Sequence, residues 1–411
     1  MARNDTTSLR KPASRTVSAL FVVFATMGAT SATIPATIPS LALNGPGAID
    51  EYLRAVPALF FGLLAGVLLS SGLGKVMSPR AMTMLGAGVQ AVGFIALAAA
   101  PGPVTFVATA AAIGLGFGLV EAGGSVLARV VSGTGTARLL SALTGTVALV
   151  AAVIPLLIAF TPIGRVPGAL FLVVGAGHLL GLFFVLRLRE PTLAAVPAPA
   201  DRSTNAHRSG SAAHPRFGGA LLAVGLGLAL YVGVETVYSG WSSTIPLRVL
   251  NLPAQQAAVG TSVFWLLLAS GRYLATFLLR RSILPTRYLL VSTTLAAAAL
   301  GATAMCIASH PIVATVTLCV AVAALGPCYS LILGVGLSRI PVDRARWATG
   351  LLVACGAGGG ALIPAVALAV ADDPASAGVF LVTGALTITS GLIVTLKSGW
   401  TALTKPTPAQ S

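Results

Sequence analysis

Twelve long apolar stretches, joined by short polar loops, dominate this sequence of 411 residues. A helix of about 20 apolar residues crosses the hydrocarbon core of a bilayer, which is about 30 Å thick. Lipid offers no partner to a backbone amide, so each stretch must satisfy its own amides as a helix. The sequence therefore predicts an all-α membrane protein with twelve transmembrane helices, at residues 17–43, 53–73, 80–100, 103–128, 139–160, 168–186, 218–247, 257–279, 288–308, 311–337, 348–371 and 378–396.

The distribution of charge agrees with this prediction and orients the chain. Only 9% of the residues are charged, against about 25% in soluble domains. A net charge of +15 would permit nucleic-acid binding, but 21 of the Lys and Arg residues lie in the two tails and alternate loops, and 3 in the remaining loops. This bias predicts that both termini are cytoplasmic. We therefore expect a multi-pass protein of the plasma (inner) membrane that does not bind nucleic acid.

The residues that carry enzyme or metal chemistry are not grouped in this sequence. The four cysteines lie in apolar stretches, without a disulfide framework or a metal-ligand spacing. The sequence shows no Ser/His/Asp set and no nucleotide-binding loop, so we expect neither an enzyme nor a bound cofactor. The basic N-terminal residues before an apolar run resemble a signal peptide, but more spans follow, so we interpret the run as the first transmembrane helix.

A polar segment rich in Pro, Ala and Ser divides the spans six and six, and the two halves repeat at an offset of about 207–210 residues. Thr37-Ile38-Pro39 matches Thr244-Ile245-Pro246, and Pro155 matches Pro364. Parallel repeats of this kind place a substrate site near the membrane midplane, between the halves. The predicted units are a cytoplasmic tail (1–16), an N-terminal six-helix bundle (17–186), a cytoplasmic linker (187–217), a C-terminal six-helix bundle (218–396) and a second cytoplasmic tail (397–411).

With twelve spans in two halves, a central linker and both termini inside, essentially the whole chain resembles the major facilitator superfamily. Three stretches are similar to its fucose permease-like group of sugar–proton symporters: LYVGVETVYSGW (230–241), GLGFGLVEAGGSVLARV (114–130) and SGRYLATFLLRR (270–281). The resemblance implies the major facilitator fold and transport by alternating access. It also implies that the span 4 glutamate, here Glu121, is linked to proton movement.

The sequence departs from this resemblance at three places. Span 1 has no acidic residue, whereas the resemblance to the fucose permease, a proton symporter, implies one in that span. The loop between spans 2 and 3, SGLGKVMSPR (71–80), lacks the Asp of the superfamily signature. Span 5 lacks the Gly-Pro and Gly-Gly pairs that are typical of drug–proton antiporters.

Three charged residues fall well within spans: Glu121, Glu235 and Arg272. A charge at the bilayer centre costs about 2.5–3.5 kcal/mol on insertion scales, which favours a functional role. Removing a carboxylate from water favours its protonated form. We therefore expect Glu121 and Glu235 to couple proton movement. Ser125 follows Glu121 by one turn on the same face and is a candidate substrate ligand.

Glu235 belongs to a polar stripe on span 7. Tyr231, Glu235, Tyr238 and Ser242 are spaced i, i+4, i+7 and i+11, so they share one helical face. Lipid would reject such a face, and we expect it to line a water-filled cavity where the tyrosines contact a sugar-like or aromatic ligand. Trp241 is on another face, and the sequence leaves open whether it binds ligand or anchors the helix at the interface.

Span 1 carries a matching stripe of hydroxyls, Thr26, Thr30, Thr33 and Thr37. Because spans 1 and 7 are equivalent in the repeat, a central site would use both, so Thr30, Thr33 and Thr37 are candidate substrate ligands. The alternative is that each hydroxyl bonds a carbonyl oxygen of its own helix.

Arg272 of span 8 lies on one helical face with Trp265, and both are candidate substrate ligands. For Arg272 three roles stay open: an ion pair with Glu235, snorkelling toward the cytoplasmic interface, or binding an anionic group of the substrate. His178 is alone on an apolar face of span 6, and we expect it to be a hydrogen-bonded packing residue.

These observations favour a secondary transporter that moves a small solute and uses the proton gradient as its energy source. A sugar-like compound is one candidate for this solute. The first alternative is an exporter of a drug or amphipathic metabolite, which the missing span 1 acid favours. The second is a membrane sensor without transport. Such a sensor would normally carry a folded soluble domain, and neither the linker nor the tails in this sequence are expected to form one. The expected partners are the small-molecule substrate and the lipid bilayer, and the expected assembly is a monomer.

Overall fold

The computed structural model describes residues 7–74, 76–99, 102–132, 136–161, 166–188, 215–279, 284–337, 345–371 and 373–399. Sixteen α-helices are assigned in these ranges. They contain twelve segments that are long and apolar enough to cross a membrane. The prediction of an all-α protein with twelve spans is therefore confirmed. Most of the predicted tails and linker lies outside the described residues.

The first six spans follow the predicted ranges closely. Each span is apolar over about 20 residues, so its amides bond within the helix rather than remain exposed to lipid. The helices are α1 (Thr7–Asn44), α2 (Ile49–Leu53) with α3 (Ala55–Leu73), α4 (Pro79–Ala99), α5 (Pro103–Ser132), α6 (Thr136–Phe160) and α7 (Pro167–Leu186).

Three of the last six spans consist of two helical segments. Span 7 is interrupted by a turn at residues 241–243, and span 8 begins with a separate single turn. The helices are α8 (Pro215–Gly240) with α9 (Thr244–Val249), α10 (Ala254–Ala257) with α11 (Val259–Leu279), α12 (Pro285–Cys306), α13 (Pro311–Leu325) with α14 (Cys328–Leu337), α15 (Ala345–Val370) and α16 (Ala377–Gly399).

Span 10 differs from the prediction of one continuous helix over 311–337. It breaks between α13 and α14, at Gly326 and Pro327. Proline has no backbone N–H and its ring collides with the carbonyl of the preceding turn, so it interrupts the helix. The break leaves carbonyl oxygens that need donors from elsewhere, and it lies near the middle of the span.

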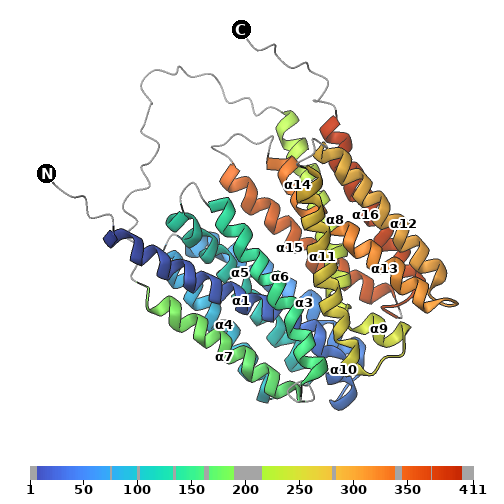
Figure 1. Ribbon diagram of the computed structural model, residues 1–411, viewed down its shortest axis with the longest axis horizontal. Helices are drawn as coiled ribbons and strands as arrows, with labels where there is room; N and C mark the ends of the chain where they lie inside the picture. Colours follow the sequence, from blue (N-terminus) through green and yellow to red (C-terminus); the bar gives the residue numbers. More distant parts are fainter. Residues whose placement is uncertain are drawn as a thin grey trace, which may run out of the picture.

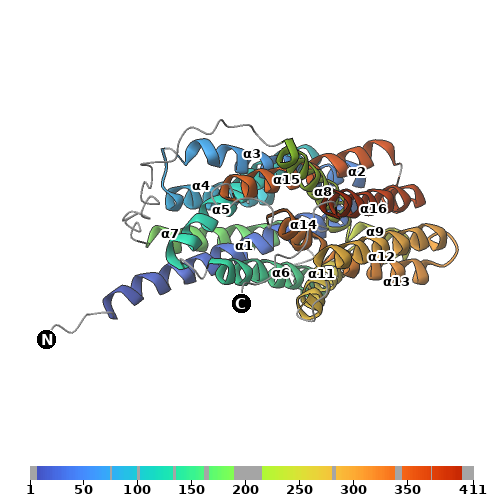
Figure 2. The same ribbon diagram turned by 90° about the horizontal axis from the view of Figure 1, so that it is seen from above.

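The helices form two groups that follow the chain order, α1–α7 and α8–α16. Figures 1 and 2 show α3 beside α15 and α6 beside α11, and these two helix pairs carry most of the contact between the groups. The chain enters α1 and α8 and leaves α16 at one end of the molecule, whereas α9 and α10 lie at the other end (Figure 1). We call these ends the linker side and the α9 side.

Close packing within the first group depends on glycine. At Gly66 of α3 a Cβ atom would lie 3.1 Å from Cα of Gly118 on α5, and at Gly118 it would lie 2.9 Å from the backbone nitrogen of Val67. Gly62 and Gly114 make equally close backbone contacts one turn nearer the α9 side. Small residues let helix backbones approach in this way in membranes.

Candidate functional site

Glu121 lies on α5, near the middle of span 4, and its side chain is half-buried. Within the part of the chain that the structure describes, its carboxylate has no hydrogen bond and no ion pair. Ser125, one turn further along α5, is also partly exposed. The structure therefore keeps these two predicted site residues on one side of α5, and both residues are partly exposed.

Glu235 of α8 is paired with Arg272 of α11. The distance between Arg272 Nη2 and Glu235 Oε1 is 3.4 Å, and the side chains are 37% and 16% exposed. Of the three roles left open for Arg272, the structure shows the ion pair with Glu235. Each charge lowers the desolvation cost of the other, because neither is taken out of water alone.

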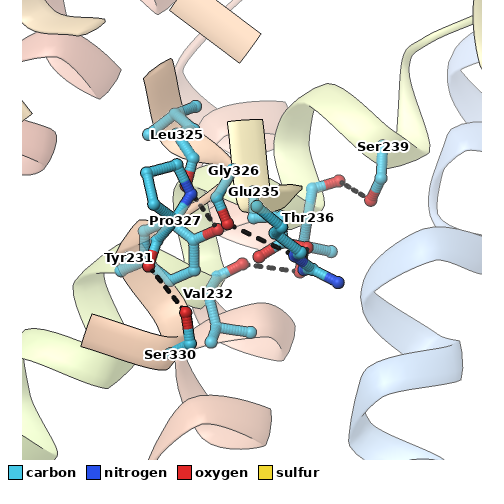
Figure 3. A network of polar contacts seen from close by, with 10 residues as sticks. Tyr231, Val232, Glu235, Thr236, Ser239, Leu325, Gly326, Pro327 and Ser330 are labelled. Atoms are coloured by element: carbon cyan, nitrogen blue, oxygen red, sulfur yellow. Dashed lines mark hydrogen bonds and ion pairs between the residues drawn. The ribbon is translucent and has the colours of Figure 1, made fainter. Parts of the chain in front are cut away.

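The same side chains hold the break in span 10. Arg272 Nε donates to the carbonyl oxygen of Gly326 (3.2 Å), and the Tyr231 hydroxyl donates to that of Leu325 (3.0 Å). Figure 3 shows Tyr231 and Glu235 converging from α8 on this bend, next to Pro327. A polar backbone in a bilayer needs such partners, so the ion pair and the tyrosine stabilise the bent helix.

Tyr329 lies just after the break, on α14. It is within electrostatic range of Glu121 as well as of Glu235 and Arg272. Its ring is 6.5 Å from that of Tyr231. Tyr329 follows Glu121 by 208 residues, within the repeat offset, so the two are equivalent in the two halves. We call Glu121, Tyr231, Glu235, Arg272 and Tyr329 the central cluster.

Trp265 is two turns from Arg272 on the same face of α11. It is half-buried and meets Phe264 edge to face, with ring centroids 5.4 Å apart. Its indole nitrogen has no hydrogen-bond acceptor among the described residues. A buried N–H without an acceptor is costly, and substrate contact with Trp265 stays a prediction.

The residues of the predicted stripe on span 7 meet different neighbours along the helix. Tyr238 and Ser242 are buried inside the C-terminal group, away from the ion pair of Glu235. The Tyr238 hydroxyl bonds Thr383 of α16, and the Ser242 hydroxyl bonds Thr261 of α11 (2.7 Å). Helical spacing predicts one shared face for these residues, but α16 covers that face at Tyr238 and α11 covers it at Ser242.

The hydroxyl stripe of span 1 is also covered. Thr33 and Thr37 are buried and donate to carbonyl oxygens of α1, at 2.7 Å and 2.8 Å. This is the local bonding that was the alternative for these residues. The stripe therefore presents no exposed hydroxyl at these positions in this conformation, and substrate contact with them stays a prediction.

Thr30 belongs to a buried polar group inside the N-terminal bundle. Its hydroxyl bonds Gln90 Oε1 of α4 (3.0 Å) and His178 Nε2 of α7 (2.8 Å). The imidazole of His178 stacks on Phe94 with ring centroids 5.7 Å apart. The prediction that His178 is a hydrogen-bonded packing residue is confirmed. Thr30 is buried beside His178 and does not line an open cavity.

Trp241 lies in the turn between α8 and α9 and is completely buried. Its indole nitrogen has no described acceptor. An interfacial anchor would expose its polar edge to headgroups, so the structure does not place Trp241 as such an anchor. A ligand contact for Trp241 stays a prediction.

Sequence reasoning missed Tyr329 and Gln90. The signal for Tyr329 was available, because the offset that aligns the halves also aligns it with Glu121, and Gly326-Pro327 marks a break just before it. Gln90 gave no such signal. A single amide on an apolar span becomes meaningful only when Thr30 and His178 lie beside it.

The two groups of helices are joined on the α9 side. Three hydrogen bonds between them are seen among the described residues, and each runs from a C-terminal side chain to an N-terminal carbonyl oxygen. These bonds are Ser243 to Pro35 (2.6 Å), Gln255 to Ile158 (3.2 Å) and Ser262 to Ala152 (2.6 Å). We call them the α9-side contacts, and they hold the two groups together at that end.

Solved structures of membrane transporters share this arrangement over nearly their whole length. A D-xylose–proton symporter aligns with a TM-score of 0.74 at 15% identity, covering 92% of this chain and 96% of its own. The chain has the major facilitator fold. A peptide transporter aligns with a TM-score of 0.72 at 17% identity, covering 97% and 99%.

A further similar structure is the inward-facing, unoccupied form of a bacterial homologue of the human lysosomal transporter Spinster. It aligns with a TM-score of 0.64 at 14% identity, covering 95% of this chain and 96% of its own. No protein-family model and no curated protein matches this sequence. Identities this low establish the fold and leave the substrate to the chemistry of the site.

Proposed function

We propose that this protein is a secondary transporter that moves a small polar solute across the plasma membrane by alternating access. The observation that carries the proposal is the central cluster, in which the Glu235–Arg272 pair holds the break in span 10 and Glu121 of the other half lies within electrostatic range of Tyr329, just after that break. Parallel repeats with the major facilitator fold bind their substrates at this level, between the halves. The proton gradient is the energy source, without a bound cofactor.

Glu121 is the proton-coupling residue of this proposal. The residue is partly exposed, and its carboxylate has no counter-charge among the described residues, so binding a proton removes a costly charge from the membrane interior. The protonated form then favours rearrangement of the two halves, which carries proton and solute together. Movement of one proton down 100 mV supplies about 2.3 kcal/mol, enough for about fiftyfold accumulation of a neutral solute.

Glu235 has a second role in this scheme. A proton on Glu235 would weaken its ion pair with Arg272, because a neutral carboxyl no longer attracts the guanidinium as strongly. The guanidinium could then donate to a polar or anionic group of the solute. Trp265, on the same face of α11, supplies a further donor. Ser125 is the candidate ligand on the opposite half.

The α9-side contacts support an inward-facing form. The positive-inside bias assigns the linker side to the cytoplasm, and the contacts hold the two groups together on the opposite side. The partial exposure of Glu121 and Arg272 then corresponds to access from the cytoplasm. We retain the two six-helix bundles (17–186 and 218–396), the linker and a monomeric state as parts of this proposal.

Export of an amphipathic metabolite is the second candidate. It is favoured by the burial of Thr30, Thr33 and Thr37, which leaves the central cluster with aromatic rings and few free hydroxyls. A sugar would use many hydroxyl and amide partners, whereas an amphipathic compound would contact Tyr329 and Trp265 through their ring faces. The two candidates predict opposite directions of solute movement under the same proton gradient.

The deciding experiment combines a thermal-shift screen of solutes with transport in vesicles. A solute that stabilises the purified protein is loaded into proteoliposomes, and its movement is followed under an imposed pH gradient. Proton-driven flux should be lost in Glu121→Gln and kept in Glu51→Gln, a control at an exposed acid near the α9 side. Stabilisation without flux in the unmodified protein would instead identify a sensor, and proton-driven flux in Glu121→Gln would remove Glu121 from the mechanism.

A further inference from the structure

The C-terminal half contains a pocket that the central cluster does not use. Its volume is about 210 Å³, and it lies between α11 and α13 on the α9 side. Cys319, Val322, Val263 and Leu267 form walls of the pocket, and Tyr238 and Ser242 lie at its inner end. Most of the lining is apolar, so an occupant must be apolar as well.

The pocket exists because the two halves differ at equivalent positions. Gly66 and Gly118 touch in the N-terminal half, and Gly271 and Gly326 touch in the same way in the C-terminal half. Four residues nearer the α9 side, the N-terminal half continues with Gly62 and Gly114, and each of these glycines meets the backbone of the opposite helix.

Leu267 and Val322 occupy those places in the C-terminal half, each four residues before its contacting glycine. Both line the pocket. Side chains of this size prevent the backbone contact that glycine permits, so α11 and α13 separate toward the α9 side. The space between α11 and α13 therefore results from Leu267 and Val322, where the N-terminal half has glycine.

The pocket opens toward the lipid-facing surface. Val263, on its α11 wall, is 39% exposed. Leu266 on α11 and Val316 on α13, which flank it, are 52% and 58% exposed. These helices are membrane spans, so the exposed flanks contact hydrocarbon. Gln256, at the α9-side end of the lining, is also exposed and lies at the start of its span, where headgroups begin.

Water is a poor occupant for this space. An ordered water needs two to four polar partners. The hydroxyls of Tyr238 and Ser242 already bond Thr383 and Thr261, and that of Thr315 bonds the carbonyl oxygen of Pro311. An empty apolar space would forfeit dispersion contacts along its walls. A hydrocarbon chain supplied by the adjoining bilayer satisfies both conditions.

We propose that this pocket binds one acyl chain of a phospholipid from the leaflet on the α9 side, with the polar part of the lipid near Gln256. The lipid would fill the separation between α11 and α13. This site is separate from the central cluster and does not depend on the proposed transport function.

The test compares two tryptophan variants of the full chain. Cys319→Trp fills the pocket, and Val316→Trp places the same bulk on the exposed face of the same helix. Each purified protein is delipidated and titrated with palmitoyl-oleoyl phosphatidylethanolamine, and bound lipid is counted by native mass spectrometry. We expect one lipid to bind the unmodified protein and Val316→Trp, and its affinity to fall at least about tenfold in Cys319→Trp.

A second measurement uses the unmodified protein, so that it does not depend on the folding of a variant. Alkylation of Cys319 by N-ethylmaleimide, read peptide by peptide, should slow when the lipid is added. Cys306, which is partly exposed and outside the pocket, should react at an unchanged rate relative to the delipidated protein. Equal lipid affinity of the two variants, or unchanged alkylation of Cys319, would overturn the proposal. Loss of substrate stabilisation in Cys319→Trp with unchanged lipid affinity would also overturn it, by assigning the pocket to the solute.

Discussion

Arg272 lies 3.4 Å from Glu235, and its guanidinium also donates to the carbonyl oxygen of Gly326. One side chain thus connects α8, α11 and the break in span 10. The carboxylate compensates the guanidinium charge inside the membrane, and the guanidinium satisfies a carbonyl that the break exposes. The pair is therefore part of the structure of the C-terminal half as well as a candidate element of transport.

The Glu235–Arg272 pair should show a favourable coupling energy. Glu235→Gln and Arg272→Gln should each lower the free energy of unfolding by about 1–3 kcal/mol, between the values for exposed and buried pairs. The double variant should lose less than the sum of both, because no unpaired charge remains. Thermal or denaturant unfolding in detergent measures the three changes. Additive losses would show that the two side chains do not stabilise each other.

Tyr329 and Tyr231 should separate transport from stability. Tyr329→Phe removes a hydroxyl near Glu121 and Glu235, so we expect weaker proton-driven flux with little change in unfolding. Tyr231→Phe removes the donor to the Leu325 carbonyl, so we expect a loss of about 0.5–1.5 kcal/mol in stability. Flux in proteoliposomes and unfolding in detergent are measured on both proteins. The same loss of stability in the two variants would contradict this division of roles.

The α9-side contacts should hold the inward-facing form. Ser243→Ala combined with Ser262→Ala removes two hydrogen bonds between the halves, each worth about 0.5–1.5 kcal/mol. The population should shift toward a form open on the α9 side. Spin labels at the exposed positions Leu43 and Arg248, one in each half, should report longer distances. Ser239→Ala is the control, since the Ser239 hydroxyl bonds Thr236 of its own helix.

The glycine contacts between α3 and α5 should be sensitive to a single methyl group. At Gly114 a Cβ would lie 2.8 Å from the carbonyl carbon of Leu59, where only backbone movement makes room. Gly114→Ala should therefore destabilise the protein by about 1–3 kcal/mol, as overpacking does. Gly88→Ala meets nothing within 4 Å and should be neutral or slightly stabilising. Equal stability of the two variants in thermal unfolding would refute the close contact.

The interior polar group of the N-terminal half should act through packing. Gln90→Leu removes the acceptor of the Thr30 hydroxyl, together with an amide nitrogen that has no described partner. Removing a buried donor without an acceptor offsets the lost bond, so stability should change by less than about 1 kcal/mol. Proton-driven flux should be retained. Loss of flux at unchanged stability would instead place Gln90 in the transport pathway.

The sequence alone determined the spans, because lipid forces every apolar stretch of sufficient length to become a helix. It also determined the repeat and the charged residues worth attention, since Glu121, Glu235 and Arg272 are costly wherever they sit in a span. The tertiary structure decided which neighbours they have. The ion pair, the bend at Pro327 and the position of Tyr329 depend on helices far apart in the chain. The same holds for the covered hydroxyls of Thr33 and Tyr238, because a helical face shows spacing but not which helix lies against it.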